Sequence, residues 1–165
     1  MFKKIILWIL VISCMTAIFA FSSQEADTSG ETSSSFIIAL IRFFDTDNSL
    51  SLQQMEKIVE DMTHIVRKCA HFSVYALLGF LIAMLLSQYN IQGIRQLIFS
   101  VIWAFLYACS DEFHQTFVKG RSGELRDVLI DTTGALCGAL LVIMLTALVK
   151  IIHKRRVADG FFKKV

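Results

Sequence analysis

The stretch CAHFSVYALLGFLIAMLLSQ occupies residues 69–88 and contains no Asp, Glu, Lys or Arg. An α-helix needs about 20 predominantly apolar residues to cross the roughly 30 Å hydrocarbon core of a bilayer. A segment in lipid must also satisfy its own backbone hydrogen bonds, which a helix does internally. We therefore expect residues 69–88 to form a transmembrane helix.

Three further apolar blocks flank this segment, at residues 5–21, 97–112 and 128–152. Of the 165 residues 55% are hydrophobic and only 18% are charged, and the mean hydropathy is +0.62. Soluble domains carry about 25% charge. The sequence therefore predicts an all-α integral membrane bundle of about four transmembrane helices, formed by a single domain over residues 1–165.

The first block follows Lys3 and Lys4, and a secretory signal has the same order of basic residues, apolar stretch and small residues. Ala20 and Ser22 are small enough to precede a cleavage point. We nevertheless expect the block to be retained as an anchor, because its end overlaps a polar motif that is described below.

Residues 22–68 form the longest segment outside the predicted spans. We expect a loop in its Ser/Thr-rich beginning, up to Ser35, and an interfacial helix in the short apolar run 36–44. Between Leu52 and Val66, apolar residues recur at helical spacing and polar residues take the other face. This pattern predicts an amphipathic outer helix, which lies either on the membrane surface or against the rest of the protein.

Basic residues decide the orientation, since cytoplasmic segments beside membrane spans carry an excess of Lys and Arg. An even number of spans puts both termini on one side. That side holds Lys3, Lys4, Arg95, Lys150, Lys154, Arg155, Arg156, Lys163 and Lys164. We predict a multi-pass protein of the cell membrane with both termini cytoplasmic, and with residues 22–68 and 113–127 facing outward.

A first polar cluster opens the second span. Arg67, His71, Tyr75 and Gly79 are spaced by four and share one face of a helix. Arg67 and Lys68 lie at headgroup level, where such side chains either meet phosphate or simply reach toward water. The cluster supplies basic, aromatic and imidazole groups for a ligand.

A second cluster, SDEFHQ at residues 110–115, ends the third span. The three- and four-residue spacing puts Asp111, His114 and Gln115 on one side of a helix. A carboxylate beside a histidine serves as a metal site, a proton relay or a plain hydrogen bond. The spacing fits no standard zinc pattern such as HExxH, so we expect no metal.

A third cluster begins with the turn residues GRSG at 120–123 and continues with Asp127 and Asp131. Asp131 lies about one turn inside the fourth span, where a carboxylate is costly and needs a partner, for structure or for function. The candidate partners are Arg67, His71 and Arg121. On the same stripe, Gly134 and Gly138 form a GxxxG step that lets another helix approach closely.

Four motifs occur in order along the chain: FSSQ at 21–24, RKCAHFSVYALLG at 67–79, SDEFHQTFVKGR at 110–121 and DVLIDTTG at 127–134. This pattern resembles the VanZ-like family of bacterial membrane proteins over nearly the whole chain. The family often has Glu before the Tyr of the second motif and Pro before the Gly-Arg of the third. This chain has Val74 and Lys119 there, and the missing carboxylate weakens a catalytic role at residue 74.

The resemblance implies lowered susceptibility to teicoplanin, an acylated glycopeptide antibiotic, and implies no biochemical mechanism. One hypothesis is a non-enzymatic protein at the outer face of the bacterial membrane that binds an anionic headgroup, a lipid-linked peptidoglycan precursor or the glycopeptide drug. Another is a membrane enzyme that modifies a lipid or cell-wall intermediate by His/Asp acid–base chemistry. A third is a transporter, for which four short spans would need a dimer.

These hypotheses share one set of residues. The catalytic candidates are His71, Asp111, Glu112, His114, Asp127 and Asp131. The ligand-binding candidates are Gln24, Arg67, Lys68, His71, Tyr75, Asp111, Glu112, His114, Gln115, Arg121, Asp127 and Asp131. We expect membrane lipids as partners and no cofactor, and we leave a homo-oligomer open. The net charge is only +2 and no basic stripe is evident, which argues against nucleic acid.

Overall fold

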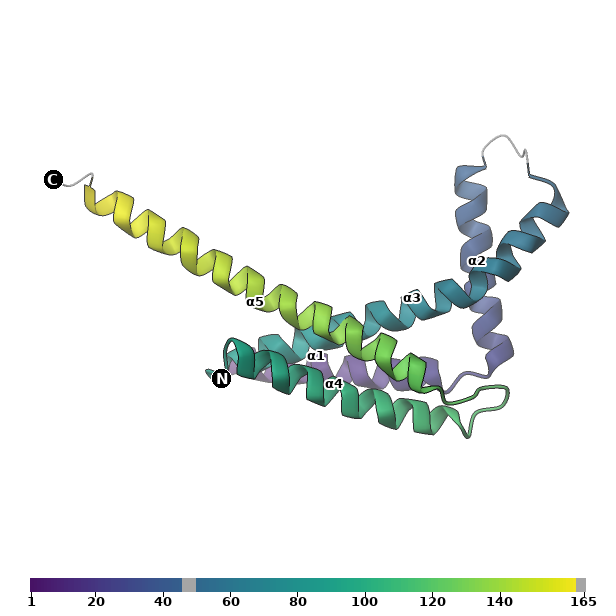
Figure 1. Ribbon diagram of the computed structural model, residues 1–165, viewed down its shortest axis with the longest axis horizontal. Coiled ribbons are helices and arrows are strands. Elements are labelled where there is room, and N and C mark those ends of the chain that lie inside the picture. The colour runs from purple at the N-terminus through teal and green to yellow at the C-terminus, as the bar shows by residue number, and fades with distance from the viewer. Residues whose placement is uncertain (46–49, 163–165) are drawn as a thin grey trace.

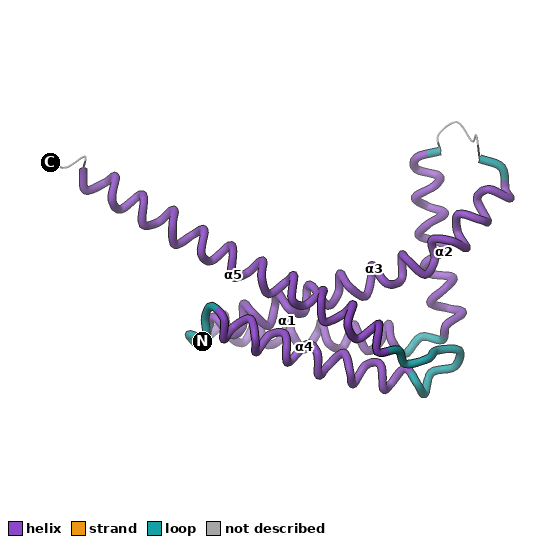
Figure 2. Tube along the Cα trace, in the orientation of Figure 1, coloured by secondary structure: helices purple, strands orange, loops and turns teal. Residues whose placement is uncertain are grey.

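The computed structural model describes residues 1–45 and 50–162, with side chains described as far as residue 155. The described residues form helices joined by short loops, with no strand among them (Figure 2). In chain order the helices are α1 Phe2–Ser22, α2 Ala26–Phe44, α3 Leu52–Ser87, α4 Ile94–Gln115 and α5 Leu125–Phe162. The predicted all-α class is confirmed.

Four of the helices, α1, α3, α4 and α5, are long and apolar enough to cross a membrane. Each contains one of the predicted spans to within a residue, so the prediction of a four-span bundle is confirmed. At 1.5 Å per residue, the 36 residues of α3 extend about 54 Å, well beyond the roughly 30 Å of a hydrocarbon core. A large part of α3 therefore extends outside the bilayer.

The segment after α1 differs from the prediction. A loop is expected up to Ser35, but α2 already begins at Ala26. The expectation is wrong because the hydroxyls of Thr32 and Ser33 each donate to a carbonyl one turn earlier, so these side chains are satisfied within a helix. The apolar run that follows forms the second half of α2 and contains the buried Ile37.

The predicted amphipathic helix is the first half of α3 and not a separate helix on the membrane surface. A capping box starts it: Ser51 Oγ accepts from the Gln54 backbone N at 3.4 Å, and Ser51 N donates to Gln54 Oε1 at 2.9 Å. No Pro or Gly occurs between Leu52 and Gly79, so the helix continues directly into the span. Of the two predicted placements, on the membrane surface or against the rest of the protein, the second is observed, because α2 packs against α3.

The bundle consists of α1, α4 and the adjoining halves of α3 and α5 (Figure 1). α2 and the beginning of α3 project beyond one end, and the last turns of α5 project beyond the other. At that second end Lys4 lies 4.2 Å over the Tyr89 ring, and Lys150 Nζ donates to Gln92 Oε1 at 2.8 Å. Two basic residues of the orientation argument lie outside the described residues: Lys163 and Lys164.

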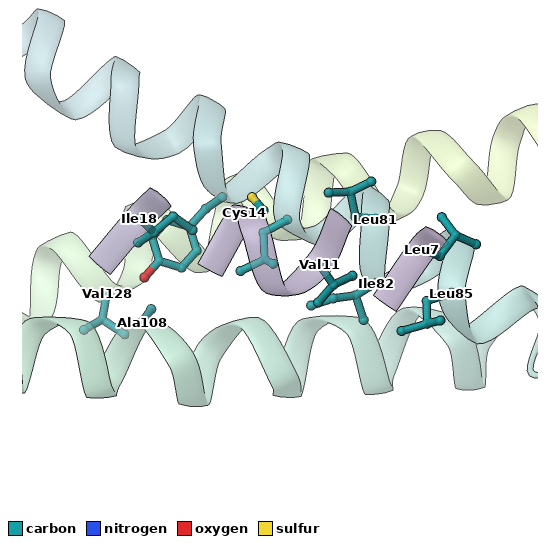
Figure 3. Packing of buried hydrophobic residues seen from close by; sticks show 11 residues of the cluster. Leu7, Val11, Cys14, Ile18, Leu81, Ile82, Leu85, Ala108 and Val128 are labelled. Atoms are coloured by element: carbon teal, nitrogen blue, oxygen red, sulfur yellow. The ribbon is translucent and has the colours of Figure 1, made fainter. Parts of the chain in front are cut away.

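One face of α1 supplies much of the buried core. Figure 3 shows Leu7, Val11 and Ile18 at successive positions along α1. Ile82 and Leu85 of α3 lie at the end of this row that Val11 and Leu7 form. All five side chains are buried in one cluster. Lipid tails are as apolar as these side chains, so close packing holds such helices together more than the hydrophobic effect does.

Glycines bring α3 and α5 into backbone contact. A Cβ added at Gly134 would collide with the carbonyl oxygen of Phe72, and one at Gly138 would collide with that of Ala76. Gly79 of α3 meets the carbonyl oxygen of Ala135 in the same way. The predicted close approach at Gly134 and Gly138 is confirmed, and α3 is the helix that approaches.

Candidate functional site

A polar cavity of about 70 Å³ lies at the end of the bundle where α1 and α4 finish and α5 begins (Figure 1). α3 passes this point and contributes the turn that begins at Arg67. The cavity is lined by Arg67, Lys68, His71, Gln115, Gly120, Arg121, Ser122, Glu124, Asp127, Ile130 and Asp131. Residues from all three later polar motifs therefore meet in space.

Two charged pairs connect α3 to α5 beside this cavity. Lys68 Nζ donates to Asp127 Oδ1 at 2.6 Å, and both side chains are 28% exposed. One turn deeper, His71 Nδ1 lies 3.7 Å from Oδ2 of the fully buried Asp131. Of the three candidate partners predicted for Asp131, His71 is the one that lies within ion-pair distance.

Gln115 connects the end of α4 to its neighbours. Its Nε2 donates to Asp111 Oδ2 at 3.2 Å and to Glu112 Oε1 at 3.3 Å, while its Oε1 accepts from Arg121 Nη1 at 3.1 Å. Glu112 Oε2 also accepts from the backbone N of Glu124 at 2.9 Å. The buried carboxylates of α4 thereby fix the loop that leads into α5.

Arg121 lies at the junction of three elements. Gly120 precedes it with φ +76°, a left-handed conformation that glycine adopts without strain. Arg121 Nη2 donates to the carbonyl of Phe21 at 3.4 Å, which connects the loop to the end of α1. Burial and the nearby Arg67 charge lower the pKa of the Arg121 guanidinium. Both arginines line the cavity, so two cations there favour an anion between them.

A larger groove of about 260 Å³ lies between α1, α2 and α3. The surface that lines this groove is mostly apolar, and α2 supplies a hydroxyl-rich side. The lining residues are Ile18, Phe21, Gln24, Ser29, Thr32, Ser33, Arg67, Ala70, His71, Val74, Tyr75 and Arg121. Three residues line both spaces, namely Arg67, His71 and Arg121. The polar cavity and the apolar groove are therefore neighbouring parts of one amphipathic site.

Some buried polar atoms of this site have no hydrogen-bond partner among the described residues. They include both carboxylate oxygens of Asp131, Asp111 Oδ1, the Tyr75 hydroxyl and Arg121 Nε. An unsatisfied buried polar group costs about 1–3 kcal/mol, so such atoms indicate a missing partner. His71, Asp111 and Asp131 also offer ligand atoms that all lie within 4.8 Å of one another, close enough to hold a metal ion.

The structure brings together nearly all of the residues that the motifs indicate. Gln24 and Tyr75 line the groove. Asp111 and Glu112 line neither space but accept hydrogen bonds from Gln115, which lines the cavity. His114 lies apart and lines neither space. Its Nε2 is 3.2 Å from Ser23 Oγ, and its ring stacks on Phe19 with centroids 4.5 Å apart.

Sequence reasoning missed the contribution of α2. Ser29, Thr32 and Ser33 line the groove, and their three- and four-residue spacing on one helical face is a signal that could have identified them. It also missed Ser22, which is fully buried at the end of α1 and has no partner for its hydroxyl among the described residues.

Four span-length helices with a buried polar site at one end of the bundle define a helical membrane protein. A model of the VanZ/LLP1 family matches residues 7–147 and so covers every motif described above. The chain belongs to the VanZ/LLP1 family. No curated protein and no solved structure matches it.

Proposed function

We propose that this protein binds an acylated anion of the cell envelope at the outer face of the bacterial cytoplasmic membrane, and thereby lowers susceptibility to teicoplanin-type glycopeptides. The ligand is an anionic lipid or a lipid-linked cell-wall precursor. The observation that carries the proposal is that the polar cavity and the apolar groove share three lining residues, Arg67, His71 and Arg121.

Charge and size support an anionic headgroup in the polar cavity. About 70 Å³ gives room for roughly five water molecules, or for one phosphate or carboxylate group. Arg121 Nε is buried without a partner among the described residues, and a guanidinium suits the oxygens of phosphate and carboxylate. Lys68 is neutralised by the Asp127 carboxylate, whereas Arg67 contacts a histidine ring and Arg121 bonds to an amide and a carbonyl oxygen. The two arginines are therefore the cations assigned to the ligand.

The groove supports an acyl or prenyl chain. Ile18, Phe21 and Val74 give it apolar walls, and it begins at the two arginines that also line the polar cavity. Each CH₂ that leaves water contributes about 0.8 kcal/mol, so even a short length of chain in this groove adds substantially to binding.

The positive-inside argument supports placing this site at the outer leaflet. Teicoplanin carries an acyl chain that concentrates it at that leaflet, whereas vancomycin has none and binds from solution. A protein that occupies anionic lipids or the lipid-linked precursor there would interfere most with the anchored drug. The link to teicoplanin itself comes from the family.

The test compares inhibitory concentrations of the two drugs in a sensitive Gram-positive host. The wild-type protein should raise the value for teicoplanin more than for vancomycin, and Arg67→Gln should abolish the difference. Arg126→Gln is the matched control, because Arg126 is exposed at the same end of the bundle and lines neither space. Equal protection against both drugs would contradict the proposal.

A binding measurement completes this test. Native mass spectrometry of the purified protein should find a co-purified anionic lipid on the wild type and on Arg126→Gln. Losing a hydrogen bond to a charged group costs about 1.5–3 kcal/mol, so Arg67→Gln should bind roughly 10–100-fold more weakly. A wild-type protein that retains no anionic lipid, or an Arg67→Gln variant that retains it fully, would contradict the assignment.

A membrane enzyme is the second candidate, and the pairing of His71 with the buried Asp131 favours it. A histidine oriented by a carboxylate is a common general base, and Asp111 lies in the same cluster. Incubating the purified protein with lipid extracts tests this reading. A change in headgroup mass that His71→Gln abolishes would support an enzyme, and unchanged lipids would favour binding alone.

A further inference from the structure

Three metal-binding side chains converge from three helices near the wall of the polar cavity. His71 comes from α3, Asp111 from α4 and Asp131 from α5, and their nearest ligand atoms all lie within 4.8 Å of one another. In a tetrahedral site with bonds of about 2.1 Å, the ligand atoms lie roughly 3.4 Å apart. Side-chain movements of roughly 1–1.5 Å would therefore close this cluster around one ion.

The carboxylates of the cluster are buried and short of partners. Asp131 is 0% exposed, and neither of its oxygens has a hydrogen-bond partner among the described residues. Asp111 is 3% exposed and its Oδ1 also has none, while its Oδ2 is held by Gln115. Two buried carboxylates facing one imidazole leave an excess of negative charge, which is costly unless a cation balances it.

The nearby basic side chains contact other groups, and Arg67 Nη2 lies 3.4 Å from His64 Nδ1. Lys68 bonds to Asp127, and Arg121 bonds to Gln115 and to the Phe21 carbonyl. Among the described residues, therefore, only His71 is within ion-pair distance of Asp131. A divalent cation would neutralise both carboxylates and satisfy the oxygens that have no partner.

We infer that His71, Asp111 and Asp131 bind one divalent transition-metal ion. The imidazole nitrogen favours zinc over magnesium, calcium and manganese, which prefer oxygen ligands. A site with three protein ligands leaves a coordination position open. Since His71 and Asp131 line the polar cavity, that position is available to an anionic group there. This last step rests on the proposed function, whereas the metal site itself does not.

The motif spacing gave no indication of this site, because metal patterns such as HExxH place two ligands on one helix. Here each helix supplies a single ligand, at positions separated by 40 and 20 residues, so only the packed bundle brings them together.

The experiment uses the full chain in detergent, stripped with EDTA, reloaded with Zn²⁺ and desalted before metal analysis. The wild type should retain one ion per chain, and Zn²⁺ should raise its melting temperature. Asp131→Asn keeps the side-chain shape and should weaken retention by at least roughly tenfold. Asp61→Asn, which removes an exposed carboxylate from the same helix as His71, should retain the ion.

A second variant covers the case in which Asp131→Asn fails to fold. Asp131→Cys replaces an oxygen ligand by a thiolate, so the Co²⁺-loaded variant should show a sulfur-to-metal charge-transfer absorption that the Co²⁺-loaded wild type lacks. A wild type that retains no metal after desalting would overturn the inference, as would equal retention by Asp131→Asn. Metal retention is measured without lipid, so it can fail or succeed independently of ligand binding.

Discussion

The contact between α3 and α5 gives a stability prediction that the structure makes quantitative. A Cβ added by Gly138→Ala would collide with the Ala76 carbonyl oxygen and would lie 2.9 Å from the backbone N of Phe80. Heavy atoms in good contact are about 3.5–4.0 Å apart. Both obstacles are backbone atoms that cannot rotate away, so the two helices must separate by on the order of 1 Å.

The cost follows from two opposing terms. Overpacking of this kind costs about 1–3 kcal/mol, and replacing Gly by Ala inside a helix returns up to about 1 kcal/mol. Because both obstacles are backbone atoms, the overpacking cost lies in the upper part of its range, about 2–3 kcal/mol, and the net destabilisation is about 1–2 kcal/mol. For a chain of 165 residues each kcal/mol corresponds to roughly 2–4 °C, so the melting temperature should fall by about 2–8 °C.

The assay is thermal unfolding of the purified protein in detergent, followed by helical circular dichroism. Gly30→Ala is the matched control, since Gly30 lies in α2 and a Cβ there would meet nothing within 4 Å. The control should melt at or slightly above the wild-type temperature, because it gains helix propensity without a clash. A Gly138→Ala variant as stable as Gly30→Ala would refute the close crossing.

Two further predictions concern topology and the outer charged pair. In a background without the four native cysteines, Glu31→Cys and Ser122→Cys should react with an impermeant thiol reagent on intact cells, and Lys154→Cys should not. Labelling of Lys154→Cys would show that the predicted orientation is wrong. Lys68→Met and Asp127→Asn should each destabilise the protein. The loss of stability in the double variant should be smaller, by about 1 kcal/mol, than the sum of the two single losses. The difference is small because the ion pair, at 2.6 Å, is partly exposed to solvent. Additive losses in melting temperature would mean that the two residues stabilise the protein independently.

The membrane helices were predictable because their length and composition follow from the thickness of lipid. Twenty residues without a formal charge, as in 69–88, have few alternatives to a spanning helix. The start of α2 was not predictable in this way. Its Ser and Thr residues suit turns and helices alike, and the backbone N of Ala26 donating to the Lys119 carbonyl at 3.3 Å is a tertiary contact that no local pattern encodes.

The site was predictable one helix at a time. Spacing by three and four residues placed His71 with Arg67, and Asp127 with Asp131, on shared helical faces. Spacing also put His114 on the side of Asp111, but packing turns that ring toward Ser23 and Phe19 of the α1 end. Helical periodicity leaves open which side chains of different helices face one another, because that depends on crossing angles and close contacts.

The order of contacts along α3 and α5 links the fold to the chemistry of the site. The two helices meet first through Lys68 and Asp127, then through His71 and Asp131, and below that through Gly134 and Gly138, where backbone touches backbone. The glycine contacts set a separation that is too small for a bulky side chain, so the carboxylate immediately above them is fully buried. Asp131 must therefore find its partners among protein groups or a bound cation, because bulk water does not reach it. The same small residues that allow the helices to pack thus lie beside the buried carboxyl group on which the inferred metal site depends.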